Sequence, residues 1–166
     1  MKKSNTQMIT MGAVIAALYV VLTLIANAFG LANYAIQVRF SEALTILPYF
    51  TPVAIPGLFV GCILSNILTG AMPLDVVFGS LATLIGAVCT YYLTNKFPEK
   101  KWLAPIPPIV SNMIIVPLIL AFVYKFEGSI PYFMITVGIG EIISCGILGL
   151  ALMKVLEKYK AVLFGI

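Results

Sequence analysis

The sequence predicts an all-α integral membrane protein, with six transmembrane helices in one compact bundle and both termini in the cytoplasm. Composition is the first reason: 61% of the 166 residues are hydrophobic and 10% are charged, whereas a soluble domain carries about 25% charged residues. Charge distribution is the second, because basic loops favour the cytoplasmic side. Eight of the ten basic residues can be placed on that side: Lys2, Lys3, Lys96, Lys100, Lys101, Lys154, Lys158 and Lys160. Arg39 and Lys125 remain for the other face.

Several functional classes are disfavoured. The chain has no histidine, so it lacks the commonest metal ligand and the usual general base. Cys62, Cys89 and Cys145 lie in apolar runs without paired spacing, which is typical of buried small residues rather than disulfides or zinc sites. The net charge of +4 is explained by topology and anionic lipid. We therefore expect no enzyme, no metal site and no nucleic-acid partner.

The first apolar run, residues 8–29, is long enough to cross a hydrocarbon core of about 30 Å. It is too long for the apolar part of a signal peptide, so we predict a retained helix that enters from the cytoplasm. The more polar residues 30–40 are expected to form an outer loop. All of residues 1–166 are predicted to form one transmembrane domain.

The next apolar stretch is divided by Pro48, Pro52 and Pro56. Proline removes a backbone donor and biases the preceding residue away from helical geometry. The sequence favours two shortened helices, at 41–51 and 55–72, over a single kinked helix.

Three more helices are predicted at 76–95, 103–124 and 131–153. Residues 95–101 between the first two are basic, and residues 125–130 form a short outer turn. Six spans keep the eight basic residues inside, whereas five would place the mid-chain lysines or the tail outside.

Ionisable residues inside a span are costly and need a reason. Glu141 lies well within the last helix with no basic residue within two turns. It is predicted to face an internal cavity and bind a ligand donor or cation; the alternative is a protonated or hydrogen-bonded structural residue.

Two further acidic positions have structural alternatives. Glu42 follows Arg39 by three residues, so the two can share a helical face. They form either an interfacial ion pair or the charged lip of a pocket. Asp75 follows Pro73 at the start of a helix, where capping of free amides is favoured and ligand binding is the alternative.

Uncharged polar residues complete the set of candidates. Asn66 and Asn112 lie in mid-span, where amides usually bond to other helices, and both could instead line a cavity. Asn33 and Tyr34, with Asn27, are candidates for a lid near the outer end of the first helix.

Small residues recur at helical spacing. Ala13 and Ala17 lie four apart on the first helix, with Gly12 and Ala16 as a neighbouring pair; Gly57 and Gly61 repeat the spacing in the third. Such faces let helices approach closely. The first helix could use its face for internal packing or for docking another membrane protein.

The segment VRFSEALTILPYFTPVAIPGLFVGC at residues 38–62 resembles the signature of the queuosine-precursor transporter family. The similarity continues through Asn66, residues 75–83, residues 103–108 with Asn112, and residues 138–141, and so covers nearly the whole chain.

Members of that family are substrate-binding (S) subunits of energy-coupling factor transporters. The resemblance implies a six-helix subunit that works with a coupling membrane subunit and two cytoplasmic ATPases. Ala13 and Ala17 match the pattern through which such subunits dock to the coupling protein. No phosphate-binding loop is present, so no cofactor is expected in this chain and ATP would be hydrolysed by the partners.

The implied ligand is a substituted 7-deazaguanine, in its aminomethyl form. One carboxylate can accept two adjacent donors of a guanine-like edge, and an ammonium group needs a second carboxylate. Tyr34, Tyr49, Phe50 and Phe78 are candidates to stack on the ring. The implied location is the bacterial cytoplasmic membrane, in a multi-pass arrangement.

The sequence also allows three alternative hypotheses about function. A membrane enzyme acting on lipid is disfavoured, because no catalytic constellation appears. A stand-alone secondary transporter would use Glu141 for proton coupling. The chain could also be an S subunit for another purine-like or vitamin ligand.

Overall fold

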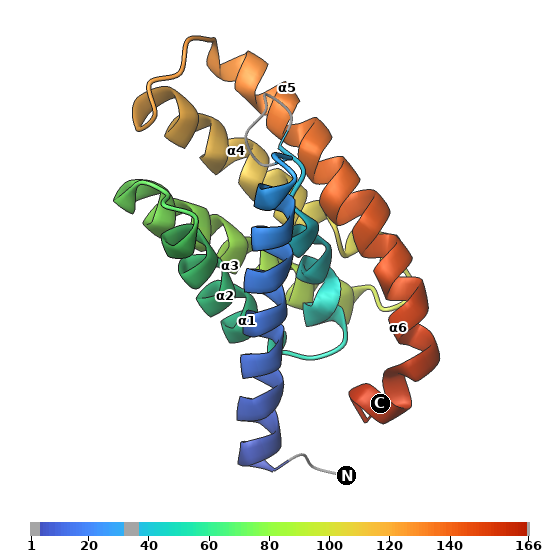
Figure 1. Cartoon of the computed structure of the whole chain (residues 1–166). Coiled ribbons are helices and arrows are strands. Elements are labelled where there is room, and N and C mark those ends of the chain that lie inside the picture. Colours follow the sequence, from blue (N-terminus) through green and yellow to red (C-terminus); the bar gives the residue numbers. More distant parts are fainter. Residues whose placement is uncertain (1–3, 32–36, 166) are drawn as a thin grey trace.

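The computed structural model describes residues 4–31 and 37–165, and within these ranges the chain is helical with no β-strand. The elements in chain order are α1 (Asn5–Ala28), η1 (Phe40–Tyr49), α2 (Ala54–Leu68), α3 (Pro73–Lys96), η2 (Lys101–Leu103), α4 (Ile106–Phe122), α5 (Ile130–Glu141), η3 (Ile142–Leu148) and α6 (Gly149–Leu163). Figure 1 shows that the start of α1 and the end of α6 lie at one end of the molecule, opposite the connection between α4 and α5.

Four helical runs are long and apolar enough to cross a membrane: α1, α3, residues 101–122 and residues 130–163. They support the prediction of an all-α membrane protein. Helix α2 is also apolar but has only 15 residues. The number of spans and the side on which the termini lie therefore remain predictions.

Helix α1 begins at Asn5, three residues before the predicted start, because Ser4 caps it. The Ser4 hydroxyl accepts from the Gln7 amide at 3.2 Å, and the Gln7 side chain accepts from the Ser4 amide at 3.0 Å. This reciprocal pair satisfies two amides that have no partner within the helix.

The two small-residue pairs of α1 lie on different faces. A Cβ added to Gly57 of α2 would lie 2.8 Å from the Gly12 carbonyl oxygen, and one added to Gly61 would lie 3.0 Å from the Ala16 carbonyl oxygen. Gly12 and Ala16 therefore serve the close contact with α2. Ala13 and Ala17 are exposed.

The predicted break in the proline-rich stretch is confirmed, because η1 ends at Tyr49 and α2 starts at Ala54. The segment predicted as a membrane helix at 41–51 is instead a ten-residue 3-10 helix, and Ser41 through Pro48 are all buried. At about 2.0 Å per residue it covers about 20 Å, which is less than a hydrocarbon core of about 30 Å. In its second half, Ile46 and Leu47 belong to the main apolar core, where they join Leu58 of α2.

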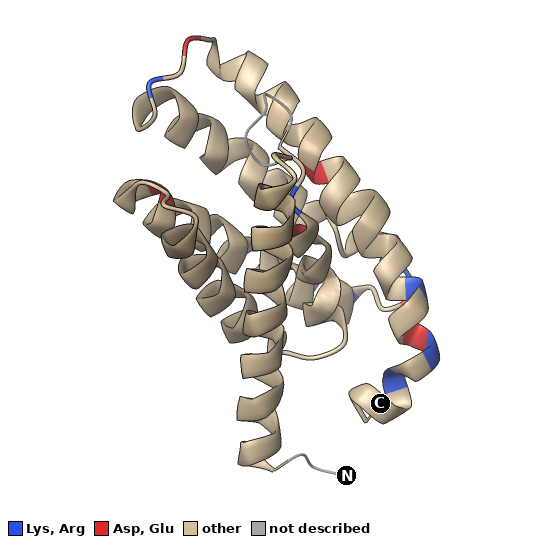
Figure 2. Ribbon diagram, in the orientation of Figure 1, with Lys and Arg blue, Asp and Glu red and all other residues tan. Residues whose placement is uncertain are grey.

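The last helical run extends beyond the predicted residue 153, because α6 continues to Leu163. Its middle is a π-helical segment, η3, which directly follows Glu141. Lys101 forms an ion pair with Glu157 of α6, and Phe164 stacks on Phe50 with ring centroids 4.9 Å apart. The lysines of α6 gather near the C-terminus (Figure 2).

The cysteine prediction is confirmed for two of the three residues. Cys62 and Cys145 are buried, and all three cysteines are free. The expectation for Cys89 was wrong: it is exposed, because it lies on the outward face of α3.

Candidate functional site

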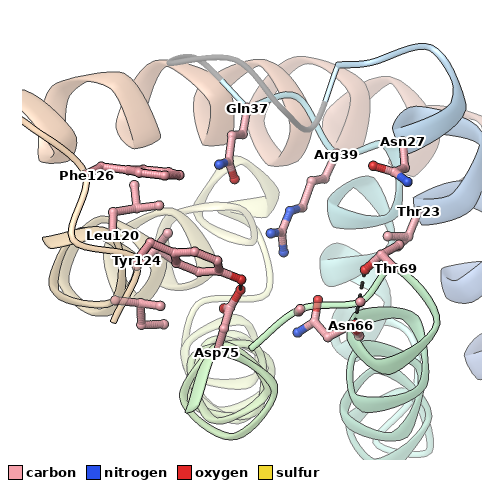
Figure 3. A pocket seen from close by; sticks show the side chains of 14 residues that line it. Thr23, Asn27, Gln37, Arg39, Asn66, Thr69, Asp75, Leu120, Tyr124 and Phe126 are labelled. Carbon is pink, nitrogen blue, oxygen red and sulfur yellow. Dashed lines mark hydrogen bonds between the residues drawn. The ribbon is translucent and has the colours of Figure 1, made fainter. Parts of the chain in front are cut away.

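A cavity of about 420 Å³ lies between α1, α3, α4, the C-terminal end of α2 and the segment before η1. We call it the large cavity. Its polar lining consists of Thr23, Asn27, Gln37, Arg39, Asn66, Thr69 and Asp75. Figure 3 shows Arg39 pointing toward its centre, with Tyr124 and Phe126 at one side and Thr69 and Asn66 at the other.

A small cavity of about 20 Å³ adjoins the large one, with which it shares Gln37, Arg39, Asp75 and Val116. Its own polar lining includes Glu42, Asn112 and Glu141. The six candidates Arg39, Glu42, Asn66, Asp75, Asn112 and Glu141 therefore lie around two adjoining spaces. This site holds three carboxylates and one guanidinium, out of six acidic residues in the whole chain.

Glu42 is held in place by α1. The residue is 2% exposed, and its carboxylate accepts a hydrogen bond from the Tyr19 hydroxyl, which is itself buried. Gly61 makes room for Tyr19, since a Cβ there would lie 2.8 Å from the Tyr19 Cβ. The same small-residue contact that joins α1 to α2 therefore brings a donor to the buried acid.

Arg39 precedes η1 in extended geometry, with φ −110° and ψ 113°. The proposed ion pair with Glu42 was wrong, because among the described residues Arg39 and Glu42 are not within ion-pair distance. The early helical start that would have put them on one face does not occur. Both residues line the small cavity, but Glu42 is buried and does not lie at an exposed rim. The other alternative, the charged lip of a pocket, stays a prediction.

Glu141 ends α5, where the π-helical segment begins. Its carboxylate accepts from the Cys145 thiol at 3.0 Å, and the residue is buried. Single π-helical turns inside α-helices are frequent at functional sites. Asn112 of α4 lies beside both Glu42 and Glu141.

Asp75 does not cap α3, although capping was the favoured interpretation. The helix starts at Pro73, with Met72 at the capping position and no side-chain cap. Proline at the first position already removes one free amide, and the Asp75 carboxylate turns instead to the Tyr124 hydroxyl, which donates to it at 2.7 Å. Burial raises the pKa of Tyr124, and the bond to Asp75 raises it further, so the phenol stays a donor.

Asn66 borders the large cavity from α2, and its amide donates to the Cys62 sulfur at 3.6 Å. Two lid candidates, Asn33 and Tyr34, lie outside the described residues. Asn27 lies at the large cavity.

The aromatic lining differs from the candidates read from the sequence. Phe50 is buried in the apolar core and Tyr49 packs against it. Phe78 is 46% exposed and does not line either cavity. The aromatic wall of the large cavity consists of Tyr124 and Phe126, whose ring centroids are 5.5 Å apart at 28°.

Sequence reasoning missed this wall because both residues sit at an end of the fifth apolar run, where aromatic side chains usually face the interface. It also missed Gln37, Thr23 and Thr69. No signal in the sequence marks these three, because they come together only through packing.

Within residues 4–31 and 37–165, one group of side chains could hold a metal ion. One ligand atom from each of Glu42, Glu141 and Cys145 lies within 4.8 Å of the others. Two of these groups are already joined by the bond from Cys145 to Glu141. The expected absence of a metal site stays a prediction.

Two comparisons with known proteins indicate the same family. A family model described as QueT transporter matches residues 9–158. The protein named Queuosine precursor transporter QueT, from Lactococcus lactis subsp. cremoris (strain MG1363), is 36% identical over 99 residues. This alignment covers 60% of the chain and 58% of the relative, which is less than two thirds of its length. No solved structure matches the chain.

Proposed function

Because the chain belongs to the QueT transporter family, we propose that it binds a queuosine precursor as the substrate-binding subunit of an energy-coupling factor importer. The family is one of transporters, in agreement with the prediction that the chain is not an enzyme. The related Lactococcus protein carries a queuosine precursor in its name.

The observation that carries this proposal is the excess of carboxylates at a cavity in a strongly apolar chain. Three carboxylates face one guanidinium, so a cationic ligand would improve the charge balance. An aminomethyl-7-deazaguanine brings one ammonium group and a base edge with adjacent N–H donors. Carboxylates accept such donors in strong, charge-assisted bonds.

The walls of the large cavity suggest how the ligand would lie. Tyr124 and Phe126 offer a flat aromatic surface, which suits a flat heteroaromatic ring. Arg39 donates only, so it would meet the base carbonyl, and Asn66 can both donate and accept. Glu42 and Glu141 lie beyond Arg39, at the small cavity.

Binding is tested on the purified protein in detergent by isothermal titration with deazaguanines, purines and vitamins. We expect the deazaguanines to bind, with the aminomethyl form ahead of the others. Preferential binding of a vitamin or an ordinary purine would replace the ligand while leaving the transporter family in place.

The proposed partners are a coupling membrane subunit and two cytoplasmic ATPases, which would hydrolyse the ATP that drives uptake. Ala13 and Ala17 would form the docking face. Their exposure supports this, because the neighbouring pair Gly12 and Ala16 is used for the contact with α2.

Adjacent residues of α1 test the docking face. Ala17→Trp should abolish uptake and co-purification with the coupling subunit, while the affinity of the isolated chain for ligand stays within about twofold. Ala16→Trp is the comparison, since Ala16 is buried and overpacking there should destabilise the fold itself. Normal transport by Ala17→Trp would remove Ala17 from the interface.

The proposed location is the cytoplasmic membrane, in a multi-pass arrangement with both termini inside. Labelling of introduced cysteines in intact cells tests it, in a Cys89→Ser background because Cys89 is exposed. Glu127→Cys should react from outside and Glu99→Cys should not. Outside labelling at residue 99 would contradict the six-span topology.

A further inference from the structure

The short non-helical segment at residues 37–39 contacts the last helical run at two points. A Cβ added to Gly140 would lie 2.1 Å from the Gln37 carbonyl oxygen and 3.0 Å from its carbonyl carbon. No L side chain fits at that distance, so the backbone of the segment rests directly on Gly140. One turn along the helix, the Arg39 amide donates to the Ser144 hydroxyl at 3.1 Å.

The same segment supplies side chains to both cavities. Gln37 and Arg39 line the large and the small cavity. Glu141, which lies between the two contact points in sequence, lines the small cavity. The position of the segment on the helix therefore determines the position of the guanidinium relative to this carboxylate.

We propose that Gly140 and Ser144 are positioning residues, which hold residues 37–39 on the last helical run and thereby set Arg39 and Gln37 for ligand. The effect on ligand rests on the proposed function; the anchoring does not. A displacement of about 1 Å is enough to spoil a preorganised binding site.

At two neighbouring glycines of the same helical run, an added Cβ would meet a side chain rather than backbone. A Cβ at Gly138 would meet the end of the Met113 side chain at 2.9 Å, and that flexible chain can turn away. A Cβ at Gly146 would meet only a methyl carbon of Ile142, at 3.8 Å. At Gly140 the obstacle is backbone, so the segment itself has to move.

The anchoring is tested without ligand, by hydrogen exchange and mass spectrometry of the detergent-solubilised chain. Gly140→Ala and Ser144→Ala should both speed exchange in a peptide covering residues 37–40, at least fivefold. Gly146→Ala is the matched control and should leave this exchange unchanged. Equal exchange in Gly140→Ala and Gly146→Ala would overturn the proposal.

The consequence for ligand is tested by titration with aminomethyl-7-deazaguanine. We expect Gly140→Ala to weaken binding at least tenfold and Gly146→Ala less than twofold. If Gly140→Ala does not fold, Ser144→Ala serves as the second variant, with an expected loss of about fivefold. Unchanged affinity in a folded Gly140→Ala or Ser144→Ala would contradict the positioning role.

A double variant separates positioning from general loss of structure. If Gly140 acts through the segment that carries Arg39, adding Gly140→Ala to Arg39→Met should cost less than threefold further. Independent effects that multiply would show that Gly140 only supports the fold. If the wild type binds no deazaguanine, the proposed function falls, and the exchange result still decides whether the anchor exists.

Discussion

The two ends of η1 belong to two different regions, the polar cavities and the apolar core. Ser41 and Glu42 at its start face the polar side, where Glu42 joins Asp75 and Glu141 around the cavities. Ile46 and Leu47 near its end belong to the apolar core. Buried charges in a membrane protein are costly and are usually retained for function, whereas apolar packing supplies stability. Substitutions at the core should therefore change stability, and substitutions at the cavities should change binding.

The largest expected effect is on the core side. Ile46→Ala should lower the free energy of unfolding by about 2–5 kcal/mol, because Ile46 is fully buried and the vacated space cannot collapse completely. Denaturant titration in detergent measures this loss. The affinity of the folded fraction for ligand should stay within about threefold.

Ile9→Ala is the control, since Ile9 is 73% exposed. A folded Ile46→Ala with normal stability and strongly reduced affinity would break the division between the two regions.

On the cavity side, Glu141→Gln should cost about 2–4 kcal/mol of binding, on the scale of removing one partner of a buried charged hydrogen bond. Its stability should stay close to that of the wild type, because Gln keeps the shape of Glu and its carbonyl oxygen can still accept from the Cys145 thiol. Titration and denaturant unfolding of the same preparation give both values. Glu99→Gln, in an exposed loop, is the control.

The same titration is made with Glu42→Gln. A loss of affinity similar to that of Glu141→Gln would place both acids at the ligand. A stability loss in Glu141→Gln without any change in affinity would make Glu141 a structural residue.

Tyr19→Phe tests the boundary between the two regions, because Tyr19 belongs to the apolar core and its hydroxyl donates to Glu42. Loss of this donor should lower the free energy of unfolding by about 1–3 kcal/mol, the range for an unpaired buried polar group. Affinity should fall as well. Tyr92→Phe is the control, because Tyr92 is 68% exposed on α3, and it should change neither stability nor affinity. A Tyr19→Phe variant that lost only stability would assign Tyr19 to the core, and one that lost only affinity would assign it to the cavities.

The smallest effect is expected for Thr90→Val. The Thr90 hydroxyl donates to the Ala104 carbonyl oxygen at 3.0 Å in a fully buried position, and its loss should cost about 0.5–1.5 kcal/mol of stability. Binding should not change. Thr10→Val, which removes a similar bond at an exposed site, should cost less in the same unfolding measurement.

The sequence predicted most of the helical segments and six polar residues of the site, for one physical reason. In a chain this apolar, each proline and each acidic or amide residue inside a span is costly, so it stands out. Pro48, Pro52 and Pro56 therefore located the break before α2, and Glu141 was recognised as a buried carboxylate.

The features that sequence reasoning missed depend on contacts between distant segments. Gly140 directly precedes Glu141, but no local pattern gives the glycine a role of its own; its importance comes from the Gln37 backbone 103 positions away. The partner of Asp75 is Tyr124, 49 positions along the chain, so a local cap appeared to be the better explanation. The 3-10 geometry of η1 is likewise unusual for ten residues and has no local signature.

We propose that the carboxylates at the two cavities recognise a cationic deazaguanine. The most direct test of this proposal is the titration of wild-type protein with aminomethyl-7-deazaguanine and with the uncharged cyano analogue, side by side. We expect the aminomethyl form to bind at least tenfold more tightly and Glu141→Gln to reduce this preference. Equal affinity for both analogues, or a preference for the uncharged one, would contradict it.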